Sequence, residues 1–104
     1  MKVLYVRVNP DLREGDKPYR THIMEIKWSV SERAARECEI VVACRLDKGP
    51  DMYVPYAAWE LVHVYQQRRV NGHPHCGLAL GEPVEFHGGP IPAKGRGGVL
   101  IGRV

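Results

Sequence analysis

Apolar and polar positions alternate along much of the first half of the chain. Residues 2–8 (KVLYVRV) are rich in β-branched and aromatic side chains and predict a first strand, which Asn9 and Pro10 end. Residues 21–30 alternate between apolar and polar side chains and predict a half-buried second strand. Residues 37–46 alternate again, which predicts a third strand. The first half therefore consists mainly of predicted strands.

The second half opens with the spacing of an amphipathic helix. Apolar side chains recur at helical intervals through residues 56–70 and predict a helix of about four turns. Pro55 suits its first turn, and Asn71 and Gly72 suit a left-handed C-terminal cap. The face expected to pack on a sheet consists of Ala58, Leu61, Val62 and Tyr65.

Three weaker signals complete the pattern. Residues 29–32 have the spacing of a capping box, and residues 32–37 (ERAARE) suit a turn with helical character. Residues 77–87 predict a fourth strand, in which a glycine and a proline indicate a bulge or an edge position. Residues 98–104 (GVLIGRV) predict the last strand.

The predicted order is strand, strand, strand, helix, strand, strand. With 104 residues, the chain has the size of one domain, spanning residues 1–104. The order resembles that of the OB-fold, a small five-stranded barrel, in topology alone. It equally suits an antiparallel sheet with a helix packed across it. We therefore expect an α+β fold: a small β-rich single domain, either an antiparallel sheet or an OB-like partly open barrel, with one long helix.

The composition is that of an ordinary globular protein. Hydrophobic residues make up 44% and charged residues 26%, which argues against a disordered or fibrous chain. No run approaches the roughly 18 apolar residues of a membrane span, and the first residues lack the layout of a signal peptide. The three cysteines form no C-x-x-C pair, which favours a reducing compartment, and the alternation of residues 37–46 predicts core positions for Cys38 and Cys44. We expect a cytoplasmic protein without a membrane partner.

The charge layout is compatible with an anionic partner but does not require one. Fifteen Lys and Arg residues against twelve Asp and Glu give a net charge of +3, with basic ends and an acidic middle. In an OB-like barrel, the loops at residues 9–20 and 88–98 would contact a single-stranded nucleic acid. This interpretation competes with one in which the loops are merely solvated, and Glu37 and Glu39 would oppose it if they faced the bound phosphates. The residues predicted to bind are Arg13, Lys17, Tyr19, Arg20, Lys94 and Arg96.

The alternative function is that of a bacterial or phage protein-interaction module, such as an inhibitor or an adaptor. It would dock through the solvent face of the predicted helix or through an open sheet edge near Pro83. The docking residues on that helix would be Glu60, His63, Gln67, Arg68 and Arg69.

Metal binding and catalysis have weaker support. His73, His75 and Cys76 are potential zinc ligands, to which Cys44 or His63 could add, but their spacing matches no zinc module. Glu60 could orient His63, and Cys76 adjoins His75, but no oxyanion donor can be assigned. No P-loop or dinucleotide-binding glycine motif is present. We therefore assign no metal, no cofactor and no catalytic residue, and expect a protein that is not an enzyme.

Overall fold

The computed structural model of the chain describes residues 1–8, 16–47, 49, 51–93 and 98–104, with only the backbone at 16–18. Strands account for 60% of the residues and helices for 14%. The elements are β1 (Lys2–Arg7), α1 (Asp16–Glu25), α2 (Glu32–Arg36), β2 (Ile40–Asp47), β3 (Met52–Val70), β4 (His73–Val84), β5 (Ile91–Pro92) and β6 (Val99–Arg103).

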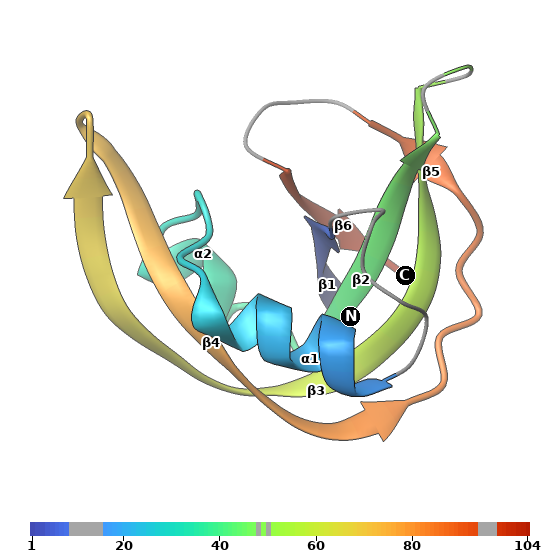
Figure 1. The fold of residues 1–104 in the computed structure, drawn as a ribbon, viewed down its shortest axis with the longest axis horizontal. Coiled ribbons are helices and arrows are strands. Elements are labelled where there is room, and N and C mark those ends of the chain that lie inside the picture. The colour runs from blue at the N-terminus through green and yellow to red at the C-terminus, as the bar shows by residue number, and fades with distance from the viewer. Residues whose placement is uncertain (9–15, 48, 50, 94–97) are drawn as a thin grey trace.

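One mixed sheet organises the molecule (Figure 1). Its strand order is β4-β3-β2-β1-β6, with β5 paired to one end of β3. Strands β1 and β2 run parallel, and every other pair is antiparallel. Parallel neighbours need a long crossover connection, and this one contains α1 and α2. The predicted antiparallel sheet or OB-like barrel with one long helix is therefore wrong.

The predicted helix at residues 56–70 is instead the outer part of β3. Three register shifts interrupt its pairing with β4, near residues 59–61, 61–63 and 65–68. Such shifts break the strict alternation of a strand, so that inward-facing Trp59, Leu61 and Val64 follow one another at intervals of two and three. Because of the bulges, the apolar positions of this strand have a spacing close to that of an amphipathic helix.

The predicted second strand, residues 21–30, is also wrong in its first half. Residues 16–25 form α1, which buries Tyr19 and Ile23 one helical turn apart. Only the end of the segment is extended: the backbone of Trp28 forms an isolated antiparallel bridge with Cys76 of β4. The segment with apolar side chains at every second position is therefore the end of a helix followed by a short extended stretch, and not one strand.

Several sequence predictions are confirmed. Strands β1, β2 and β6 correspond to the first, third and last predicted strands, and their boundaries differ from the predicted ones by at most three residues. The helical turn is α2, but the capping box predicted over residues 29–32 is wrong: the N-cap is Ser31, whose hydroxyl accepts a hydrogen bond of 3.1 Å from the backbone N–H of Ala34. The fourth predicted strand corresponds to β4, an edge strand that begins four residues earlier than expected.

The sheet is buried on both faces at its centre. One face packs against α1 and α2, and takes Leu4 and Val41 from the middle strands. The other face takes Val3 and Val42, and is covered by the chain after β4, where Phe86 meets Tyr5 edge-on at 5.9 Å. Burial on both faces explains why β2 is apolar almost throughout.

Strands β3 and β4 form a long hairpin that curves around the helices (Figure 1). Its turn is Asn71-Gly72, with φ of 51° and 80°. Two consecutive residues of positive φ define the type I′ turn that suits a tight hairpin, and Asn-Gly is its preferred sequence. The residues interpreted as a helix cap are therefore the turn of a hairpin.

Both tryptophans are buried against the helical face, but their indole N–H groups differ. Trp28 donates a hydrogen bond of 2.9 Å to the carbonyl oxygen of Ile23, near the end of α1. The N–H of Trp59 is buried and has no acceptor among the described residues. An unmet buried donor costs about 1–3 kcal/mol, which the packing of the buried Trp59 ring must offset.

This difference gives a stability prediction. Trp28→Phe and Trp59→Phe remove the same atoms, but only the first leaves a carbonyl without its donor. We expect Trp28→Phe to lower the free energy of unfolding by about 1–2 kcal/mol more than Trp59→Phe does. Urea denaturation of both variants measures the difference. Greater destabilisation by Trp59→Phe would show that its N–H has a partner in solution.

Candidate nucleic-acid interface

The residues predicted to bind nucleic acid do not form a shared surface in the described part of the chain. Arg13, Lys94 and Arg96 lie outside the described residues, and Lys17 is described by its backbone alone, in α1. Arg20 is half-buried, and its guanidinium donates a hydrogen bond of 2.8 Å to the carbonyl oxygen of Leu80. That contact ties α1 to β4.

Tyr19 occupies a structural position. It is 5% exposed, and its ring stacks on that of Tyr56 with the centroids 6.0 Å apart. The guanidinium of Arg45 lies 4.7 Å from the centroid of the Tyr56 ring. The ring of Tyr19 is therefore buried between α1 and β3, and does not offer a face on which a base could stack.

The outer end of the β3–β4 hairpin is the feature that sequence reasoning missed. We call residues 66–75 the arm. Residues 66–73 are exposed, and the turn lies beyond α2 in Figure 1. A register shift sets the arm apart from the rest of the hairpin, at Gln66, whose φ is 51°. The sequence did contain one signal for this hairpin, the Asn-Gly pair, because Asn-Gly between β-branched and aromatic runs is typical of a hairpin turn.

The charge of the arm has one sign. Residues 61–80 contain no Asp or Glu, whereas they include Arg68 and Arg69. Pairing is regular at the tip, with Arg68 opposite His75, Arg69 opposite Pro74 and Val70 opposite His73. Side chains alternate along a strand, so the two arginines project from opposite faces of the ribbon. The arm is thus a two-stranded ribbon with a cation on each face.

Three contacts hold the base of the arm against the helical layer. The side-chain oxygen of Gln67 accepts a hydrogen bond of 2.7 Å from the backbone N–H of Glu32, in α2. The hydroxyl of Tyr65 donates one of 2.9 Å to the carbonyl oxygen of Met24. The ammonium of Lys27 lies 4.8 Å from the centroid of the Tyr65 ring. The arm is therefore anchored at its base and exposed at its tip.

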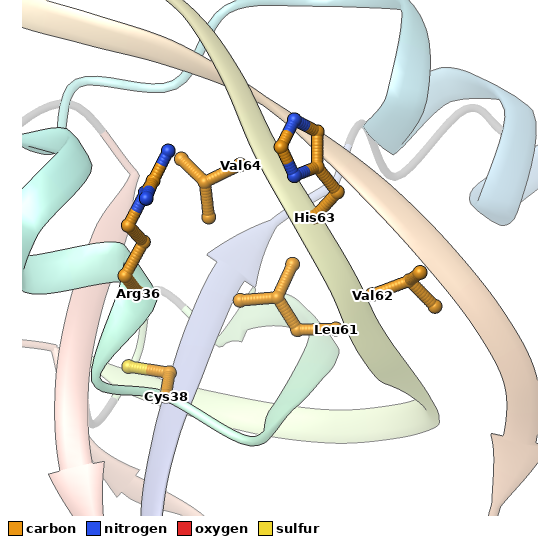
Figure 2. Close-up of a pocket in the computed structure, with 6 residues that line it drawn as sticks. All are labelled: Arg36, Cys38, Leu61, Val62, His63 and Val64. Atoms are coloured by element: carbon orange, nitrogen blue, oxygen red, sulfur yellow. The ribbon is translucent and has the colours of Figure 1, made fainter.

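A small pocket lies where the hairpin passes α2 (Figure 2). Arg36 and Cys38 line it together with residues 61–64 of β3, and Figure 2 shows Leu61 and Val62 on opposite sides of that strand. Its volume is about 200 Å³, which is below the range of roughly 300–1,000 Å³ typical of small-molecule sites. The geometry does not favour a small-molecule ligand here.

The potential zinc ligands after the turn are divided between two environments. His75 is half-exposed, and its Nδ1 lies 3.1 Å from the carbonyl oxygen of His73. Cys76 is fully buried in the core beneath α1 and α2. Among the described residues, no three His, Cys, Asp or Glu side chains are grouped so as to hold a metal ion.

All three cysteines are free and buried, which confirms the core positions predicted for Cys38 and Cys44. Burial raises the pKa of the Cys44 thiol to about 12, and it also raises the pKa values of Cys38 and Cys76. The reactive thiolate is therefore scarce at neutral pH.

This burial predicts inert thiols. In native protein at a pH of about 8, we expect labelling by a thiol-specific disulfide reagent to take hours, because each thiol is covered and its pKa is raised. In denaturant, all three thiols should react within minutes. Reaction of Cys44 in native protein as fast as in denaturant would contradict the burial.

Comparisons with known proteins supply no family for this chain. No family model matches it, and neither a curated protein nor a solved structure does. Across the described residues, none of the helices has the length and apolar character needed to cross a membrane.

Proposed function

We propose that this protein binds double-stranded nucleic acid through the arm at the end of the β3–β4 hairpin. The observation that carries the proposal is an exposed two-stranded ribbon with arginines on both faces and no acidic residue from Leu61 to Leu80. Phosphate contacts by such cations supply most of the sequence-independent affinity for nucleic acid.

The shape of the arm supports a duplex ligand. A two-stranded ribbon fits the major groove of B-DNA, which is about 12 Å wide. With Arg68 and Arg69 on opposite faces, a ribbon in the groove would direct one cation toward each phosphate backbone. Gln66 and Asn71 are exposed on the same arm and could donate hydrogen bonds to base edges.

The case for a single-stranded ligand is weaker than the sequence indicated. It rested on an OB-like barrel, which the fold replaces with an open mixed sheet, and on Tyr19 as a stacking platform, which is buried. No Tyr, Trp or Phe occurs in residues 66–75, whereas binding of single strands draws much of its energy from aromatic stacking. A contribution from Arg13, Lys94 and Arg96 stays a prediction.

Fluorescence anisotropy with a labelled DNA duplex of about 20 base pairs tests the proposal. Wild-type protein should bind, and the logarithm of the affinity should fall linearly with the logarithm of the salt concentration. For the variant Arg68→Ala/Arg69→Ala, we expect a loss of about tenfold per arginine at ~50 mM salt, and a salt slope smaller by about two.

The matched control is Arg7→Ala/Arg103→Ala. Both residues are exposed, and they lie on β1 and β6, at the other end of the strand order from the arm. This variant has the same net charge as the arm variant but should keep most of the affinity. Equal losses in the two variants would mean that net charge alone attracts the DNA, and tighter binding of a single strand of the same length would reject a duplex ligand.

A further inference from the structure

A second surface of the protein is apolar and acidic. A shallow groove of about 610 Å³ lies where β3 bends past the start of β2. Met1 and Val62 line it and are 57% and 65% exposed, which makes them two of the four large apolar side chains that stay exposed among the described residues. Glu39 and Glu60 are also in its lining, and no Lys or Arg is, while the N-terminal ammonium of Met1 donates a hydrogen bond of 3.1 Å to the carbonyl oxygen of Val104. The groove thus combines apolar surface with negative charge.

Glu60 and Val62 share one face of β3 within this groove. Both side chains lie over Gly81 of β4, where a Cβ atom would come within 3.1 Å of Glu60 Oε2 and 2.7 Å of Val62 Cγ2. Glycine at this position therefore allows the carboxylate and the isopropyl group to lie side by side. Nearby Glu37 is already paired with Lys2 at 2.6 Å, whereas no ion pair of Glu60 occurs among the described residues.

The arm carries the complementary pair on the same strand. Arg68 and Val70 are two residues apart, and their pairing with β4 has no register shift, so they project from one face. Val70 is 47% exposed, the third of the four exposed apolar side chains in the described part of the chain. The groove thus presents a carboxylate beside a valine, and the arm presents a guanidinium beside a valine at the same spacing.

The two surfaces of one molecule cannot meet each other. Val62 and Val70 are eight residues apart on β3, which spans at most about 26 Å over that length and less where bulges curve it. Exposed apolar patches of this kind typically mark interaction sites, and opposite charge selects the partner. Contact between these two surfaces therefore requires two molecules.

We propose that the protein associates with itself by docking the arm of one copy into the groove of another, with Val70 against Val62 and Arg68 facing Glu60. The contact joins two different surfaces, so a dimer needs two reciprocal contacts, and a single contact leaves an arm and a groove free for further copies. This proposal does not depend on nucleic-acid binding, although both would use Arg68.

Sedimentation velocity of the full chain, freed of nucleic acid, tests the proposal. At ~50 mM salt, the average mass of wild-type protein should rise with concentration. Glu60→Lys and Arg68→Glu each place like charges in contact, so each variant alone should need at least about tenfold higher concentration to associate. Glu60→Gln, which removes the charge without reversing it, should have a smaller effect in the same direction.

Mixing the two charge-reversal variants distinguishes this contact from any other. The first variant has a basic groove and the second an acidic arm, so these surfaces are complementary and an equimolar mixture should associate again. The double variant Glu60→Lys/Arg68→Glu should also recover. A wild-type protein that stays monomeric at all concentrations, association that neither variant weakens, or a mixture that fails to recover would each overturn the proposal. If Arg68→Glu abolishes DNA binding without weakening self-association, this contact is rejected and the proposed function remains intact.

Discussion

Strand β3 forms hydrogen bonds with β2 along its first half and with β4 along its second half, and the shape of the molecule depends on this double pairing. Its first half, 52–60, pairs with β2, whereas residues 58–70 pair with β4. Buried backbone N–H and C=O groups need hydrogen-bond partners. Strand β3 therefore begins to pair with β4 before its pairing with β2 ends. Trp59 lies at this change of partner, fully buried under the helices. Beyond it, bulges let the hairpin curve around α1 and α2.

The strands that pair centrally could be predicted from local sequence, whereas the hairpin could not. Residues 2–8 and 98–104 are rich in β-branched and other strand-forming side chains, and residues 40–44 (IVVAC) are a continuous apolar run. In β3, bulges break the period of two, and the result resembles a helix over 56–70. The parallel pairing of β1 with β2 could not be predicted from local sequence either. It requires a helical crossover, and part of the first helix of that crossover, α1, had been predicted as a strand because its residues alternate.

The candidate site shows the same division. Basic residues in polar, glycine-containing sequence drew attention to residues 9–20 and 88–98, but Tyr19 and Arg20 serve packing and the contact between α1 and β4. The arm was missed because Arg68 and Arg69 were assigned to the solvent face of a predicted helix. Only the assignment of Asn71-Gly72 as a hairpin turn makes the arginines the tip of an exposed ribbon. The interpretation of this turn as a helix cap thus contributed both to the wrong fold and to the missed site.

The extended state of residues 56–70 is the claim on which the arm, the groove and both proposals depend. NMR of isotope-labelled protein tests it directly. Backbone chemical shifts through these residues should have the values of a strand, and Val64 should show cross-strand contacts to Leu78, its partner in β4. Helical shifts over 56–70, with contacts between residues three and four apart in place of the cross-strand contacts, would contradict the hairpin and everything built on it.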